Sequence, residues 1–155
     1  MLNKGLFTSN TDDWSTPQDF FDKLNAMFDF QLDVAASADN AKCQKFFTKE
    51  DNGLIQEWSN RNWMNPPYGR TIGEWIKKAD AEAEKGKLTV ALLPARTDTK
   101  WFQDHCQKWH YVFVRGRLKF GGGGERFSTF PVCGSLLWNR EVKKAMFSFT
   151  FWHRI

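Results

Sequence analysis

The order of a strand, a helix and a second strand between residues 62 and 93 constrains the fold of this chain most strongly. Residues 62–64 have the composition of a short strand, and Thr71 with Glu74 forms a capping-box pattern before apolar residues at helical spacing. Gly86 suits the end of that helix, and residues 88–93 are apolar enough for a buried strand. Two strands joined through a helix run parallel in one sheet, so the pattern predicts an α/β fold.

The flanking segments extend this sheet. Thr16 and Pro17 suit the N-cap and the first position of a helix with one apolar face, and residues 28–34 alternate as a strand does. That strand ends in small residues at positions 35–37, which is where open α/β sheets place their ligands. Thr97 is expected to cap a further helix. Strands expected at 111–114 and 134–138 crowd the end of the chain, so we predict a mostly parallel sheet with an antiparallel edge.

Length and charge set broad limits on the function. A chain of 155 residues fits a single domain spanning 1–155, in which residues 1–13 form a flexible arm and no separate target-recognition domain has room. The net charge of +4 is a mild bias toward polyanions, and an ordinary solvated basic surface explains it as well. Eight Trp and fifteen Phe exceed what a core needs and suit a stacking surface for bases.

The remaining composition favours a reduced, water-soluble protein. The three cysteines and three histidines lack the spacing of a metal site, and no leader or apolar run of membrane-spanning length is seen. We therefore expect a cytoplasmic protein that has no metal and no membrane partner. His105-Cys106 beside Asp104 has the composition of a nucleophilic site, but packing on a helix is the better interpretation. Cys133 does not directly follow a proline, which disfavours a cytosine C5 methyltransferase.

The tetrapeptide Asn65-Pro66-Pro67-Tyr68 carries the most chemical information. A proline-stiffened turn accounts for it without any function. The chemical alternative starts from the N6 amine of adenine, whose lone pair is delocalised into the ring and is therefore a poor nucleophile. The Asn65 side-chain oxygen and the Pro66 carbonyl would accept from its two N–H bonds and localise the lone pair, and the tandem prolines would preorganise that contact. Tyr68 would stack on a base flipped out of the duplex. A cationic sulfonium donor allows direct in-line transfer without a strong general base.

The wider sequence resembles the compact bacteriophage-type DNA N6-adenine methyltransferases of the Dam family. The matching segments run in order over nearly the whole chain, and they are Trp14-Ser15-Thr16-Pro17, Leu32-Asp33-Val34-Ala35-Ala36, Asn40, Asp51-Asn52-Gly53-Leu54, Trp58, the tetrapeptide, residues 93–102 and residues 115–120.

The resemblance implies a Rossmann-like methyltransferase fold with S-adenosylmethionine as the donor, in the cytoplasm of a bacterium or a phage-infected host. Asp33 is expected to accept from the ammonium group of the cofactor, and Asp51 to meet its adenine amine. The full set of cofactor-binding residues implied in this way is Trp14, Thr16, Pro17, Asp33, Ala35, Ala36, Asn40 and Asp51. The small residues at 35–37 stand where larger adenine methyltransferases have a glycine-rich turn, and the short stretch from Asp33 to Asn65 suggests an abbreviated strand and helix.

Double-stranded DNA is the expected partner, with a monomer or a weak homodimer as the oligomeric state. The residues expected to contact phosphates, with one arginine reading guanine, are Arg70, Arg96, Arg115, Arg117, Lys119 and Arg126. Glycines at 121–124 would let a loop close over the DNA. Two other functions stay open: an N-methyltransferase acting on RNA or on a protein glutamine, and a catalytically inert DNA-binding module.

Overall fold

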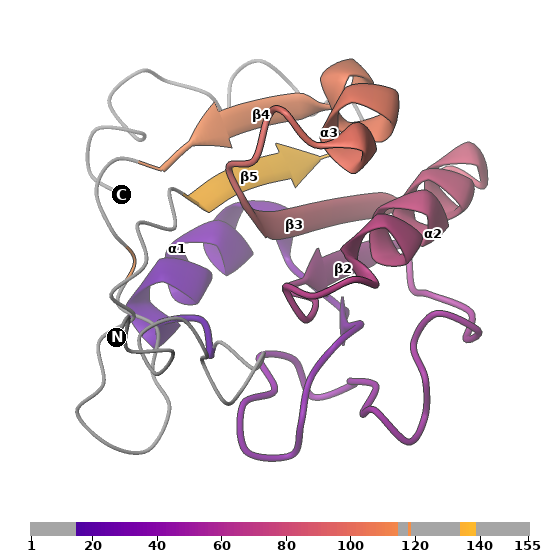
Figure 1. The fold of residues 1–155 in the computed structure, drawn as a ribbon. Coiled ribbons are helices and arrows are strands. Elements are labelled where there is room, and N and C mark those ends of the chain that lie inside the picture. The colour runs from indigo at the N-terminus through magenta and orange to yellow at the C-terminus, as the bar shows by residue number, and fades with distance from the viewer. Residues whose placement is uncertain (1–14, 115–117, 119–133, 139–155) are drawn as a thin grey trace, which may run out of the picture.

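The computed structural model describes residues 15–114, residue 118 and residues 134–138. A five-stranded sheet in the order β1-β2-β3-β5-β4 forms its centre (Figure 1). The first three strands, β1 (Leu32–Asp33), β2 (Arg61–Met64) and β3 (Leu88–Pro94), are parallel. Strand β5 (Gly134–Trp138) runs antiparallel between β3 and β4 (His110–Phe113). The predicted α/β class and the mostly parallel sheet are confirmed. The antiparallel strand β5 is not at the edge of the described sheet, however, because β4 lies outside it.

Helix α1 (Gln18–Phe28) corrects two expectations about the first element. Its N-cap is Pro17, without a side-chain cap, so Thr16 is not the capping residue. The helix includes Phe28, in keeping with its predicted apolar face, and ends at Asp29 in the left-handed region with φ 50°, so the strand expected over residues 28–34 is limited to β1 at Leu32–Asp33. Phe28 is buried with Phe21 and Leu24 at helical spacing, and this packing outweighs the strand-like alternation.

The connection from β1 to β2 contains no helix. Residues 45–47 lie beside β1 instead, through a parallel bridge between Asp33 and Phe46. The Asp33 N–H donates to the Lys45 carbonyl at 3.0 Å, and the Phe47 N–H donates to the Asp33 carbonyl at the same distance. The expected abbreviation of a strand and a helix is therefore present in this segment.

Helix α2 (Ile72–Glu84) and strand β3 match their predictions closely. Thr71 is the N-cap, but its side chain makes no capping hydrogen bond, so the predicted capping box marks the position without forming its bonds. Gly86 follows the helix with φ 82°, a left-handed conformation that glycine adopts without a steric cost.

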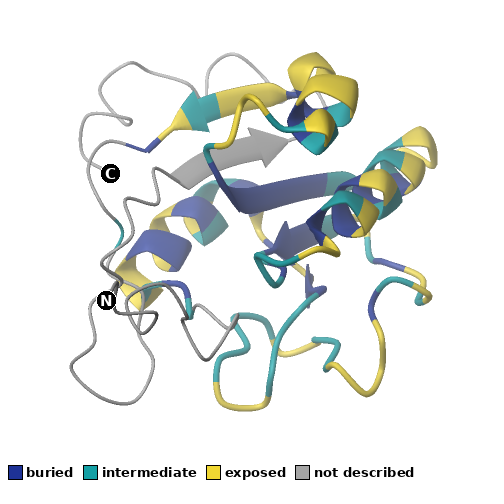
Figure 2. Cartoon of the chain, viewed as in Figure 1, coloured by how far each residue is buried: buried dark blue, intermediate teal, exposed yellow. Residues whose placement is uncertain are grey.

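Two cores cover the two faces of the sheet. Successive residues of β3 point to opposite faces, so Val90 and Leu92 pack with α1 while Ala91 and Leu93 pack with α2. Figure 1 shows α1 and α2 on opposite sides of β2 and β3, and Figure 2 shows the buried stripes of both helices beside these two mostly buried strands. The sheet is thus the middle of three layers.

Of the elements after β3, the next two helical segments lie on the α2 side. Helix α3 (Lys100–His105) begins after Thr99, so the predicted cap at Thr97 is wrong by two residues. It continues into the 3-10 helix η2 (Cys106–Lys108). Cys106 is fully buried, and burial raises the pKa of its thiol to about 12. This confirms the packing interpretation of His105-Cys106. No helix among the described residues is long and apolar enough to cross a membrane.

Candidate active site

A cavity of about 870 Å³ lies at the carboxyl ends of β1 and β2. Parallel strands end at the same edge of a sheet, so the turn after β1 and the tetrapeptide after β2 meet there. Five of the predicted cofactor-binding residues and two of the tetrapeptide line it: Thr16, Asp33, Ala35, Ala36, Asn40, Asn65 and Pro67. Pro17, Asp51, Pro66 and Tyr68 are not among the lining residues, and Trp14 lies outside the described residues.

Asp33 is the buried charge of this cavity, with only 3% of its surface exposed. One carboxylate oxygen accepts the Ala35 N–H at 3.3 Å, and the other accepts the Lys42 N–H at 3.0 Å. Burial raises the pKa of Asp33 to about 6, while the two N–H donors and the Lys42 charge partly oppose that rise. The carboxylate therefore shapes the loop beyond β1 and remains costly to ionise until a cation lies beside it.

The loop at 48–54 forms another wall, and its acidic residue has a local partner. The exposed Asp51 carboxylate accepts from the backbone N–H and from the hydroxyl of Thr48, both at 2.8 Å. These two hydrogen bonds lower the pKa of Asp51. In this arrangement the carboxylate closes a turn, and its expected contact with a cofactor amine stays a prediction.

Gly53 belongs to a segment that carries the family resemblance, but no role was predicted for it. It is buried, and a Cβ at this position would lie 2.2 Å from the Val34 carbonyl oxygen. Only a residue without a side chain allows the backbone of the loop to pack so closely against the end of β1. Its place after Asp51 and Asn52 was a usable turn signal, but the close approach depends on packing between distant segments.

The side chain of Asn65 is held from two directions. Its Nδ2 donates to the Thr16 hydroxyl at 3.1 Å, and its Oδ1 accepts from the Tyr68 hydroxyl at 2.8 Å. The two partners orient the amide so that its oxygen and nitrogen are distinguished. Thr16, which was expected to cap a helix and flank the cofactor, thus bonds to the first residue of the tetrapeptide.

Tyr68 is anchored on the side of β3. Its single O–H proton is shared between Asn65 and the more distant Leu92 carbonyl at 3.3 Å, and burial raises the pKa of Tyr68 well above its usual range. The hydroxyl therefore stays protonated and serves as a donor at any physiological pH. Stacking of this ring on a base stays a prediction.

Among the basic residues predicted to contact DNA, Arg70 and Arg96 are described, and both are exposed. Arg70 follows the tetrapeptide, and Arg96 follows β3, so both lie in loops at the carboxyl ends of strands. The other predicted contacts, Arg115, Arg117, Lys119 and Arg126, fall outside the described residues, as do the glycines at 121–124.

A family model and two phage relatives identify the same family. The family model described as DNA N-6-adenine-methyltransferase (Dam) matches residues 5–154. The chain is 38% identical over 97 residues to a DNA N-6-adenine-methyltransferase of Escherichia phage T1, covering 61% of this chain and 40% of that protein. It is 36% identical over 109 residues to a DNA N-6-adenine-methyltransferase of Haemophilus phage HP1, covering 68% of this chain and 62% of that protein. A putative methyltransferase of Escherichia coli, YfdM, is 42% identical over 65 residues, which are 37% of this chain and 71% of that protein. The matches thus span less than two thirds of either phage protein.

Proposed function

The chain belongs to the Dam family of DNA N-6-adenine-methyltransferases, and from this premise we propose that it transfers a methyl group from S-adenosylmethionine to N6 of adenine in double-stranded DNA. One observation carries the proposal: a single cavity is lined by the small-residue turn after β1 and by Asn65 and Pro67 after β2. The three parallel strands with helices on both faces are compatible with an abbreviated Rossmann-like methyltransferase fold.

The cavity fits the proposed cofactor in size and in chemistry. Its volume of about 870 Å³ lies in the range of ordinary small-molecule sites, and Ala35 and Ala36 leave room for a ligand to approach the backbone. The buried Asp33 carboxylate supplies one negative charge for an ammonium group. When bound, S-adenosylmethionine supplies an electrophilic methyl group on a positively charged sulfur. Thr16 and Asn40 line the same cavity as further polar partners.

The chain's own contribution to the reaction is to hold the amino group of an extruded adenine. The Asn65 side-chain oxygen and the Pro66 carbonyl would accept its two N–H bonds, which localises the nitrogen lone pair toward the methyl donor. Thr16 and Tyr68 fix the Asn65 amide before the substrate arrives, so little reorganisation is needed at the moment of transfer. An amide oxygen has two lone pairs and can accept from an amine in addition to a phenol.

Contacts with DNA are proposed for the basic residues around the mouth of the cavity. The exposed Arg70 and Arg96 flank the carboxyl ends of β2 and β3, where the backbone of a duplex would lie if its adenine entered the cavity. We assign them to phosphates, because exposed arginines in loops position a duplex without reading its sequence. Arg115, Arg117, Lys119 and Arg126 extend this proposal along the chain.

The test is transfer of labelled methyl groups from S-adenosylmethionine to DNA, RNA and protein in parallel, followed by mapping of the modified base. We expect N6-methyladenine in duplex DNA alone. Asn65→Ala should lower the rate by about a hundredfold or more, since one preorganised transition-state contact is lost. Asn60→Ala, which changes an exposed asparagine just before β2, is the matched control and should keep full activity. Labelling confined to RNA or protein, or an Asn65→Ala variant of wild-type rate, would refute the proposal.

A further inference from the structure

We propose that Trp58 is a positioning residue for the cofactor cavity: its indole N–H holds the Gly53 carbonyl and thereby sets the wall formed by the loop at 48–54. The inference rests on the proposed function, since it concerns the affinity of that cavity for S-adenosylmethionine. Trp58 itself is not among the lining residues, and it is 98% buried with 2% of its surface exposed.

The contact between Trp58 and the loop is direct and buried. The Trp58 Nε1 donates to the Gly53 carbonyl oxygen at 2.8 Å. Its ring stacks on that of Trp75 with centroids 6.5 Å apart, and Trp75 lines the cavity next to Gly53. Atoms of the Trp75 ring lie 3.1 and 3.2 Å from where a Gly53 Cβ would be. The backbone at Gly53 is therefore packed closely against Val34 and against both indoles.

A cluster of charged residues around Glu82 holds Trp58 in position. Glu82 on α2 is fully buried, and its carboxylate pairs with Lys78 at 2.8 Å, with Lys85 at 2.9 Å and with Lys87 at 2.8 Å. Burial favours the neutral acid, but hydrogen bonds from the three lysines outweigh it and lower the pKa of Glu82 to about 2. The carboxylate is thus ionised throughout the physiological pH range, so its ion pairs with the three lysines persist over that range.

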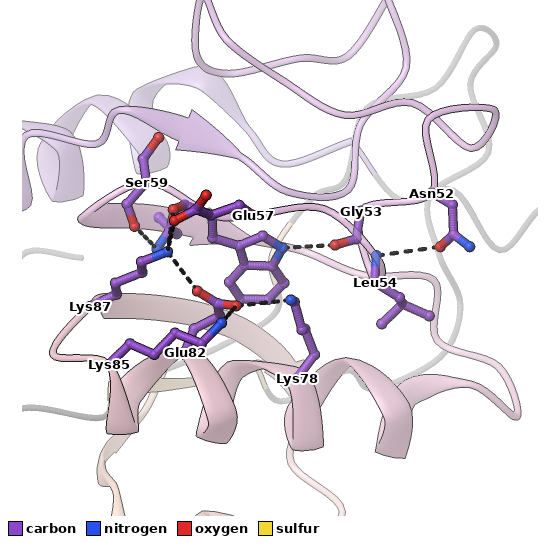
Figure 3. Close-up of polar contacts among 11 residues, drawn as sticks. Asn52, Gly53, Leu54, Glu57, Ser59, Lys78, Glu82, Lys85 and Lys87 are labelled. Carbon is purple, nitrogen blue, oxygen red and sulfur yellow. Dashed lines mark hydrogen bonds and ion pairs between the residues drawn. The ribbon is translucent and has the colours of Figure 1, made fainter.

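Two of these lysines contact Trp58. Lys87 donates to the Trp58 carbonyl at 2.7 Å, and the Lys78 ammonium lies 5.8 Å from the centroid of its ring, within the range of a cation–π interaction. Figure 3 shows Lys78, Lys85 and Lys87 gathered around Glu82, with Gly53 farther along the network toward Asn52. The chain of contacts therefore runs from α2 through one tryptophan to the backbone of the cavity wall.

The decisive variant is Trp58→Phe, which keeps a large ring and removes the indole N–H. Calorimetric titration of the full chain with S-adenosylmethionine should give a Kd raised about fivefold, the usual effect of one buried hydrogen bond. The kcat at saturating cofactor should stay within about twofold of wild type, because the tetrapeptide is untouched.

Trp109→Phe is the matched control. Trp109 is also buried, and its Nε1 donates to Asp80 at 2.7 Å, but it lies outside the cavity lining. This variant should lower the melting temperature at least as much as Trp58→Phe while leaving the cofactor Kd unchanged. Equal Kd values for wild type and Trp58→Phe, or equal Kd increases in both variants, would overturn the positioning role.

A second substitution covers the case in which Trp58→Phe fails to fold. Lys87→Gln releases the Trp58 carbonyl and leaves the ring in place, so it should raise the Kd less than Trp58→Phe; no rise at all counts against the inference. A wild-type chain that binds no S-adenosylmethionine would instead refute the proposed function, so the two failures are distinguishable.

Discussion

Replacing Asp33 with asparagine, and measuring S-adenosylmethionine binding between pH 5 and pH 7, tests how the buried carboxylate is used. The pKa of Asp33 in the free protein is about 6, against 3.8 for the unperturbed group, because burial opposes its ionisation. The cofactor ammonium stays protonated over most of this pH range. If only the ionised carboxylate binds the cation, the competent fraction is about 9% at pH 5 and about 91% at pH 7, so the Kd should fall about tenfold between them.

The same carboxyl also makes the stability of the ligand-free protein depend on pH: stability falls as the pH rises, whereas cofactor affinity increases. Its folded pKa of about 6 lies above the unfolded value of 3.8, so between these values the folded chain holds a proton that the unfolded chain has released. The free energy of unfolding of the ligand-free protein therefore falls as the pH rises through this window, by about 3 kcal/mol in all, and stays lower above it. Bound cofactor offsets this loss, because its cation favours the ionised carboxylate.

Asp33→Asn should weaken binding at pH 7 and make the Kd nearly independent of pH. Asp29→Asn is the control: that carboxylate pairs with Arg61 at 2.5 Å at the amino end of β2, away from the cavity, and its loss should leave the tenfold pH dependence intact. Isothermal titration calorimetry at matched ionic strength is the assay. A wild-type Kd that is flat from pH 5 to pH 7, or a steep profile that survives in Asp33→Asn, would refute the reasoning.

Three further predictions follow from the site. Thr16→Val removes the hydroxyl that accepts from the Asn65 amide, so kcat should fall about tenfold while Thr16→Ser restores it; equal rates in steady-state assays of the two variants would contradict this. Arg70→Gln should reduce the slope of log K against log salt for duplex binding by about 0.9, whereas Arg61→Gln at the opposite end of β2 should not change it; an unaltered slope removes Arg70 from the interface. Gly53→Ala places a methyl group 2.2 Å from a backbone carbonyl, so it should cost about 2 kcal/mol in urea denaturation and weaken cofactor binding; a fully stable variant would show that the loop relaxes freely.

The parts of the fold that were predictable are those with local causes. Strand β3 is an uninterrupted apolar run, and α2 lies between a capping residue and a glycine, so composition and spacing locate both. The start of β1 was mistaken because residues 28–34 alternate as a strand does, whereas Phe28 also belongs to the apolar face of α1. The buried packing of Phe28 decides between them, and that packing is a tertiary property.

The site was predicted through its tetrapeptide and through the turn after β1, and less well through its loops. Asp33 and Asn65 meet at one cavity because parallel strands end at a common edge, which the order of elements already implies. Gly53 and Trp75 were not foreseen as cavity residues. In the sequence, the glycine is explained by a turn and the tryptophan by the apolar face of a helix. Their role in the cavity wall depends on the close approach of Gly53 to Val34.

Several polar side chains around the cavity hydrogen-bond to the backbone of the loops that form it, because the connection between β1 and β2 contains no helix. Residues 34–60 have no helix to satisfy their backbone groups, so side chains replace one: Asp33 accepts two N–H groups, Asn40 accepts the Ser37 N–H at 2.7 Å, and Asp51 closes the turn at Thr48. A carboxylate committed to two backbone donors is held in place before any ligand binds, which lowers the entropic cost of binding. Burial makes the charge of this carboxylate costly until a cation arrives, while the two N–H donors offset part of that cost. Preorganisation by the donors and the raised pKa of Asp33 therefore have opposing causes, and a variant that loses the donors should raise the pKa further.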